Sequence, residues 1–267
     1  MIILSCSLSM CWQTVSWGSQ SENHRHLTAG VELFDWQEFD PNTSKRLLSE
    51  HGARLTLQAG WDNLRPVERF GPINFKTRIY SGAIDYDGQT QSLIDPSKTG
   101  IFVATTSRYI GLGAELEKLY PLKEQRNTNL LLALGVDFWR RNIQKNIDAQ
   151  GNPVAGASED YLGLYSRLGV QWQNQSTFGK SQARFGIKYP LRIDERTIDI
   201  ILHPQPSLSL FAAYRLDLAD TNHTIIELYY DSLRLDTSPV VYDKYGSPWL
   251  QPKSQQNSVG IMIGIPF

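Results

Sequence analysis

The sequence has almost no cysteine, no long apolar run and no excess of charge of one sign. Its two cysteines, Cys6 and Cys11, lie near the start. A chain free of cysteine beyond that point is typical of exported bacterial proteins and of many cytosolic ones. The apolar runs fall far short of the roughly 18 residues that a membrane-spanning helix needs, which excludes a helical membrane protein. The 26 basic and 27 acidic residues nearly cancel, so we expect no nucleic-acid partner.

What is present indicates a folded, exported chain. The 267 residues, 41% of them hydrophobic, are neither disordered nor collagen-like in composition and allow one large domain or two small ones. Residues 1–12 are largely apolar and precede small and polar residues, as in a secretory signal, although the usual basic start is missing. We expect residues 1–21 to be a leader and residues 22–267 the folded domain, with a frayed N-terminus as the alternative. Met10 stands where acylation of Cys11 would need a small residue, which argues against a lipoprotein.

Apolar and polar or small residues alternate through ten segments with turn residues between them. Alternation with a period of two places a different environment on each face of a β-strand. The last segment is the clearest, because every second residue from Val259 to Phe267 is apolar. The predicted strands are about 27–38, 53–62, 73–84, 101–117, 130–139, 161–172, 182–193, 207–218, 224–235 and 258–267.

A soluble β-sandwich also alternates, but three features favour a membrane barrel. The segments reach about ten residues or more, whereas strands of soluble sheets usually have five or six. Their polar faces are rich in glycine and charge, as a crowded or wet lumen requires. Aromatic residues gather near segment ends, where interfacial girdles would place them. These aromatic residues are Trp36, Trp61, Tyr80, Tyr109, Phe138, Trp139, Trp172, Tyr189 and Tyr230.

Taken together, the ten segments, the leader and the last strand resemble the outer-membrane β-barrel proteins of Gram-negative bacteria. The resemblance covers about 27–267. It implies an all-β fold, a closed antiparallel transmembrane β-barrel of about ten strands, with eight or twelve as alternatives, in the bacterial outer membrane. It implies outer-membrane lipid, lipopolysaccharide and the barrel-assembly machinery as partners. In that family the machinery reads a last strand of alternating apolar residues with a C-terminal aromatic, here Val259, Ile261, Ile263, Ile265 and Phe267.

The family's rule that both termini face the periplasm fixes the expected topology. The predicted extracellular connections are 39–51, 85–100, 140–160, 194–206 and 236–257. The predicted periplasmic ones are 63–72, 118–128, 174–181 and 219–223. The extracellular set is longer on average, as outer-membrane barrels have it.

The alternation also predicts which charged side chains face the lumen. A ten-stranded barrel is only slightly wider than the eight-stranded kind that side chains fill, and unpaired buried charge is costly. We therefore expect a lumen filled by ion pairs. The alternative is a narrow pore in which Arg167, Arg184, Lys188, Arg192 and Arg215 favour anions. The inward residues are predicted to be Arg54, Lys76, Arg78, Arg167, Arg184, Lys188, Arg192, Arg215, Glu32, Asp62, Glu115, Glu117, Asp137, Asp217, Glu227 and Asp231.

The omptin proteases are ten-stranded outer-membrane barrels with an Asp pair and an Asp–His pair at the extracellular rim. Asp85 and Asp87 have the first spacing, but Asp220 and His223 are one residue too far apart. The topology also places His223 at the periplasmic end, whereas acid–base partners must lie within hydrogen-bond reach or one water. We interpret residues 85–88 as a turn built on Asp and Gly.

Other catalytic or metal-binding patterns are weak. His51 and His203 lie near the outer rim without a recognisable Ser partner, and neither HExxH, CxxC nor a P-loop occurs. We read 148–152 as a turn rather than a calcium loop and the pair of histidines at 24 and 26 as solvated linker, so no catalytic residue, metal or cofactor is expected. The expected role is structural or surface-interacting, with the anion channel and then a rim hydrolase as alternatives. The candidate extracellular ligand site is 236–257, unless this connection folds inward, and its exposed residues are Tyr242, Tyr245, Pro248 and Trp249.

Overall fold

The computed structural model describes residues 24–64, 72–90, 99–122, 127–197, 199–219 and 223–267. The predicted leader, residues 1–21, and Asp220 lie outside the described residues. No helix in these ranges is long and apolar enough to cross a membrane.

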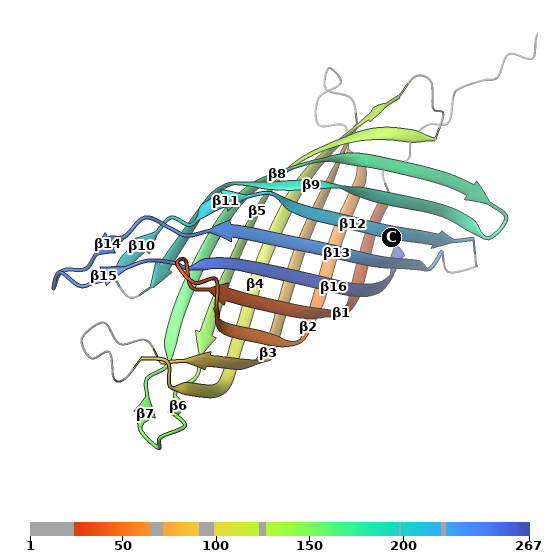
Figure 1. Ribbon diagram of the computed structural model, residues 1–267. Helices are drawn as coiled ribbons and strands as arrows, with labels where there is room; N and C mark the ends of the chain where they lie inside the picture. The colour runs from red at the N-terminus through yellow and green to blue at the C-terminus, as the bar shows by residue number, and fades with distance from the viewer. Residues whose placement is uncertain (1–23, 65–71, 91–98, 123–126, 198, 220–222) are drawn as a thin grey trace, which may run out of the picture.

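The fold is a closed ring of ten long antiparallel strands (Figure 1). Each strand pairs with its neighbours along the ring, and the ring closes through pairing of β1 with β16 and of β8 with β9. The prediction of a closed ten-stranded antiparallel barrel is therefore confirmed. The ten strands are β1 (His24–Phe39), β2 (Arg46–Leu64), β3 (Ile73–Gln89), β4 (Phe102–Pro121), β5 (Thr128–Ile143), β8 (Ala157–Ser176), β9 (Gly179–Thr197), β12 (Ser209–Leu218), β13 (Ile225–Asp236) and β16 (Lys253–Pro266).

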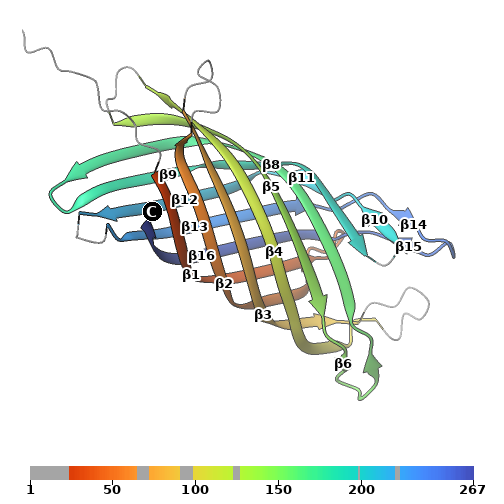
Figure 2. The ribbon, with the colours of Figure 1, turned by 180° about the vertical axis from the view of Figure 1, so that it is seen from behind.

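Six short strands lie at the end of the barrel away from the C-terminus (Figures 1 and 2). They form the hairpins β6–β7 and β14–β15 and extend the wall beside β9 and β13. Following the predicted topology, we call this end extracellular and the opposite end, where Phe267 bonds to the backbone of Arg25, periplasmic. The short strands are β6 (Asn146–Ile147), β7 (Pro153–Val154), β10 (Ile200–Leu202), β11 (Gln205–Ser207), β14 (Val241–Tyr242) and β15 (Pro248–Trp249).

A broad apolar belt covers the outside of the ring. The belt follows from the period-two pattern, because alternate residues of each strand point away from the lumen. A closed barrel of an even number of antiparallel strands with such a belt is the architecture of bacterial outer-membrane proteins, and this chain has that architecture. Exposed belt residues include Leu27, Val31, Leu33, Leu55, Leu57, Ile79, Ile110, Leu112, Leu116, Leu134, Val136, Phe138, Leu162, Leu164, Leu168, Phe185, Ile187, Leu210, Tyr214 and Leu228. The predicted assembly-signal residues Val259, Ile261, Ile263, Ile265 and Phe267 complete it, with 47–69% of their surface exposed.

The strands run further toward the extracellular end than the alternation predicts. β2 begins at Arg46 rather than near Ala53, and β5 continues to Ile143. Above the lipid belt the outer face meets water, so polar residues occupy both faces and the period of two disappears. The predicted extracellular connections were therefore too long. The three that the structure describes in full are 40–45, 144–156 and 237–252.

A bulge in β9 reverses its faces and corrects the prediction for Arg192. Across the bulge Tyr165 pairs with Pro190 and Leu164 with Arg192, so Leu191 is the extra residue. Pro190 lacks the N–H that a regular ladder would use at this point. Arg192 consequently lies outside, with its side chain 68% exposed, and Ile193 turns inward at 4% exposure.

The predicted aromatic girdle is also partly wrong. Phe138, Trp172 and Tyr189 are exposed on the outer face as expected. Four others lie inside the barrel, each exposing at most 3% of its surface, because they occupy positions of the alternation that face the lumen. They are Trp36, Tyr80, Tyr109 and Trp139.

Candidate functional site

The middle of the lumen is organised around the buried ion pair between Arg54 and Glu32. These side chains come from the inward faces of β2 and β1, and their closest atoms, Nη2 and Oε1, are 2.6 Å apart. Tyr229 on β13 donates its hydroxyl to the other carboxylate oxygen at 2.6 Å. The guanidinium also lies 3.8 Å from the ring centre of Phe34 and 4.4 Å from that of Tyr80. The charge of Arg54 is thus neutralised and covered by aromatic faces.

A second group of charges joins β8 to strands on both sides. Arg167 lies 3.0 Å from Glu115 on β4 and 2.7 Å from Asp231 on β13. Lys188 on β9 lies 2.7 Å from the second oxygen of Asp231. Tyr165 donates to Glu115 at 3.1 Å. Arg167 therefore bridges two carboxylates that belong to distant parts of the ring.

Toward the periplasmic end, further pairs cross the lumen. Arg184 on β9 lies 3.3 Å from Glu117 on β4. Arg215 on β12 lies 3.3 Å from Asp62 on β2 and 2.6 Å from Asp217 on its own strand. The Arg184–Glu117 and Arg215–Asp62 pairs join strands that are not neighbours in the ring, so the lumen is bridged at this level too.

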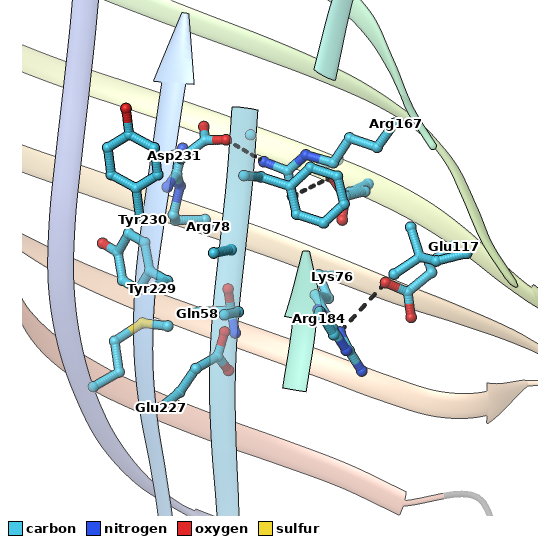
Figure 3. A pocket seen from close by; sticks show the side chains of 18 of the residues that line it. Gln58, Lys76, Arg78, Glu117, Arg167, Arg184, Glu227, Tyr229, Tyr230 and Asp231 are labelled. Atoms are coloured by element: carbon cyan, nitrogen blue, oxygen red, sulfur yellow. Dashed lines mark hydrogen bonds and ion pairs between the residues drawn. The ribbon is translucent and has the colours of Figure 1, made fainter. Parts of the chain in front are cut away.

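The remaining predicted lumen residues surround a small cavity (Figure 3). Its volume is about 90 Å³, which is room for a few water molecules. Arg78 lies 3.5 Å from Asp137, and Lys76 and Glu227 line the wall. Arg167 and Arg184, with their partners Asp231 and Glu117, line it as well. A cavity of this size is well below the roughly 300 Å³ or more of most ligand pockets.

Glycines on the inner face let tyrosine rings lie flat against the wall. A Cβ added to Gly111 would overlap the ring of Tyr80, and one added to Gly260 would overlap the ring of Tyr229. In register, Gly111 is directly opposite Tyr80, and Gly260 is directly opposite Tyr229. The glycines thus make room for the side chains that fill the lumen.

The extracellular half of the lumen holds a compact apolar and aromatic cluster. Residues from eight of the ten long strands meet there, and the rings of Trp139 and Tyr161 stack at 4.7 Å between centres. Aliphatic side chains fill the spaces between the rings, as in the core of a soluble protein. The cluster consists of Phe34, Trp36, Leu48, Tyr80, Ile84, Tyr109, Trp139, Tyr161, Ile193, Leu233 and Leu235.

Arg141 is the charged centre of this half. Its side chain is 1% exposed and lies 3.0 Å from Glu50, 2.9 Å from Glu38 and 2.8 Å from Glu159. Ser107 and Tyr109 also donate to Glu50. Sequence reasoning missed this group because it assigned 39–51 and 140–160 to connections. Continuing the alternation of this strand by two residues would have found it, because Arg141 then faces inward like Trp139.

The extracellular hairpins are held by aspartate-based turns. In the β14–β15 hairpin, Asp243 accepts from the backbone N–H groups of Tyr245 and Ser247 at 2.8 Å and from Trp249 Nε1 at 3.2 Å. These hydrogen bonds lower the pKa of the Asp243 carboxyl below its usual value. Asp148 has the same role in the β6–β7 hairpin, where the backbone of Asn152 lowers its pKa. Tyr242 and Tyr245 project from the first hairpin with 68% and 82% exposure.

The candidate catalytic groups remain dispersed. Asp85 and Asp87 are exposed on β3, so the interpretation of 85–88 as a turn was wrong. His223 follows β12 at the other end of the barrel. His203 Nδ1 lies 2.8 Å from Asp194, which also pairs with Arg192, on the outer surface. Across the described part of the chain, no three Asp, Glu, His or Cys side chains are close enough to hold a metal ion.

Neither a family model nor a curated protein matches the sequence. Among solved structures, the chain is similar to the outer membrane protease OmpT from Escherichia coli, with 10% identity, a TM-score of 0.44 and coverage of 93% of this chain and 98% of that one. It is similar to the β domain of the Bordetella autotransporter BrkA, with 10% identity, a TM-score of 0.45 and coverage of 90% and 98%. It is also similar to Ail of Yersinia pestis, with 10% identity, a TM-score of 0.30 and coverage of 92% and 99%. The ladder, belt and lumen define the barrel independently of these likenesses.

Proposed function

We propose that this protein is a closed, rigid scaffold of the outer membrane that holds its extracellular hairpins for contact with a partner at the cell surface. The observation that carries the proposal is the bridging of the lumen at every level. Arg215–Asp62, Arg167–Asp231 and Arg141–Glu38 each join strands that are not neighbours in the ring. Such bridges fill the space through which a solute would pass.

The energetics of buried charge favour a permanent filling. Removing one partner of a buried ion pair costs about 3–5 kcal/mol, because the other charge is left uncompensated. A solute that opened the lumen would have to break several such pairs at once. The apolar cluster above them would also have to separate, at about 25 cal/mol for each Å² of apolar surface exposed.

The anion-channel alternative finds less support. Its cations would have to be available to a passing anion, but Arg184, Lys188 and Arg215 lie within 3.3 Å of carboxylates. Arg192 belongs to the outer surface. The basic residues of the pore hypothesis are therefore either paired with carboxylates or located on the outer surface.

The β14–β15 hairpin is the best candidate for the contact surface. Its exposed tyrosines present large, rigid rings with a polar tip, the kind of residue enriched at protein interfaces. Asp243 fixes the turn that carries them, and Lys244 lies 5.2 Å from the Tyr245 ring centre. A turn held in this way loses little conformational entropy when it binds.

Cysteine labelling of intact cells tests the presentation of this hairpin, because the chain has no cysteine beyond Cys11. Tyr245→Cys is expected to react with a membrane-impermeant maleimide on intact cells. Thr177→Cys, in the exposed turn between β8 and β9 at the other end, is the matched control and is expected to react only after the outer membrane is permeabilised. The opposite pattern, or labelling of neither residue on intact cells, would refute extracellular presentation.

A further inference from the structure

The outer surface carries four arginines along the extracellular border of the apolar belt on β4, β5 and β9. Together with two aspartates on β8 and β9 they form a group that we call the arginine patch, and Figure 2 shows β4, β5 and β8 side by side. Four guanidinium groups against two carboxylates leave a formal charge of +2. The patch consists of Arg108, Arg140, Arg192, Arg196, Asp160 and Asp194.

The two aspartates hold arginines in place and leave donors for a ligand. Arg140 pairs with Asp160 through Nε at 2.6 Å and Nη2 at 2.9 Å. Arg196 is opposite Asp160 on the other side, in register with it. Asp194 likewise accepts from Arg192 Nε at 2.9 Å. The Arg140 pair uses one edge of its guanidinium, so the other N–H groups remain available.

The patch borders directly on lipid-facing side chains. In register, Arg140 is opposite Ile110 and Arg192 is opposite Leu164. These two apolar residues are 56% and 45% exposed on the belt. The guanidinium groups therefore stand at the height where acyl chains end and lipid head groups begin.

The border has the opposite sign on the three strands next to the patch, since β3 pairs directly with β4. There Asp35, His51 and Asp85 follow one another in register across β1, β2 and β3. A general basic collar, which would serve only to orient the barrel, would surround the ring. The acidic stretch on β1–β3 interrupts any such collar, and the outward Arg234 on β13 stands apart from the patch, bonded to Asn257. The arginines of β4, β5 and β9 therefore form a local group.

We propose that the arginine patch binds the phosphate group of an outer-leaflet lipid whose acyl chains lie on the adjoining belt. Guanidinium groups bind phosphate through paired hydrogen bonds, which makes arginine the preferred residue for this head group. The position at the edge of the belt favours a membrane lipid over a soluble anion, because acyl chains and phosphate are then satisfied together. The inference depends on the barrel fold and not on the scaffold proposal.

Native mass spectrometry of the detergent-refolded barrel, titrated with bisphosphorylated lipid A, tests this proposal. The double variant R140Q/R196Q is expected to bind the lipid at least tenfold more weakly than the wild type. The matched control K45Q/R46Q removes two exposed positive charges where the turn after β1 meets the start of β2 and is expected to leave the affinity unchanged. D160N removes a negative charge from the patch but keeps an oxygen that can accept from Arg140, so it is expected to bind at least as tightly as the wild type.

Two further arms identify the ligand chemistry. Dephosphorylated lipid A is expected to bind the wild type and R140Q/R196Q equally weakly, and millimolar inorganic phosphate is expected not to displace the phosphorylated lipid. Equal affinity of the wild type and R140Q/R196Q for phosphorylated lipid A, an equal loss in K45Q/R46Q, or displacement by inorganic phosphate would overturn the proposal. Unboiled samples run on a gel verify folding, and R108Q, expected to lose about threefold in affinity, replaces the double variant if that variant does not fold.

Discussion

Arg141 Nη1 on β5 lies 2.9 Å from Glu38 Oε1 on β1, although three other strands separate β5 from β1 around the ring. This contact can form only if the barrel is closed and its extracellular half is narrow. The same guanidinium reaches Glu50 on β2 and Glu159 on β8, so one side chain ties together four strands. Arg141 is therefore expected to be the side chain on which the closure of this half depends most.

Replacing Arg141 with methionine is expected to lower the free energy of unfolding by about 3–5 kcal/mol, because three carboxylates lose their common cation in a buried site. Urea titration of the barrel in detergent measures the change. Lys253→Gln is the control, since its pair with Asp236 is 64% and 50% exposed and such surface pairs contribute about 0–1 kcal/mol. Equal effects of the two variants would contradict the assignment of Arg141 as a structural centre.

The contact between Gly111 and Tyr80 gives a steric prediction. Gly111→Ala is expected to destabilise the barrel by about 1–3 kcal/mol, because the new methyl group overlaps the tyrosine ring. Gly113→Ala is expected to cost less, since its Cβ would come closest to the Asp137 carboxylate, at 3.2 Å, and would otherwise be in ordinary contact distance of the backbone. Combining Gly111→Ala with Tyr80→Leu tests the cause, as the two effects should be strongly non-additive in a double-mutant cycle. Simple additivity would show that the ring is not what the methyl group displaces.

The β14–β15 hairpin gives a pH prediction. Hydrogen bonds from the backbone of Ser247 lower the pKa of Asp243, so its contribution to hairpin order is present above the ordinary Asp pKa of about 3.9 and is lost only as the pH falls through the lower folded value. The amide resonance of Tyr245 in protein labelled with ¹⁵N-tyrosine is expected to keep its position from pH 7 to about pH 4 and to move below that. Asp243→Asn is expected to abolish the acid transition. A transition at or above the ordinary value would refute the proposed role of Asp243.

The terminal residue gives a prediction about assembly rather than stability. Phe267 exposes 69% of its surface to the lipid side, so Phe267→Ala is expected to change the unfolding free energy of refolded protein by about 1 kcal/mol or less. The same variant is expected to reduce the amount of folded barrel in cells several-fold, because the predicted assembly signal loses its aromatic end. Comparing urea titration in vitro with a heat-modifiability gel of cell envelopes separates the two effects. Normal assembly of Phe267→Ala would show that Phe267 is not part of the assembly signal.

The barrel could be predicted because the lipid belt imposes a strict rule on the sequence. In β16 every outward residue from Val259 to Phe267 must be apolar, and the inward residues between them need only fit the lumen. Beyond the belt the outward residues face water and no longer need to be apolar. Glu50 and Arg141 lie in strands whose outer faces meet water, so their alternation is hidden and they were assigned to connections.

The face of Arg192 could not be predicted from period two alone. A single extra residue, Leu191, moves every later side chain of β9 to the opposite face. Pro190 marks the place, since proline within a sheet is confined largely to edges and bulges. Its neighbour Tyr165 gives no second signal, because the partner strand continues regularly through this point.

The most direct test of the closed lumen is single-channel conductance of the refolded barrel in a planar bilayer, on protein whose unboiled sample migrates as a compact barrel. The wild type is expected to show no conductance steps, and the double variant R141A/E50A, which removes the centre of the extracellular half, is expected to show brief openings. Stable, charge-selective steps from the folded wild type would contradict the scaffold proposal and restore the channel.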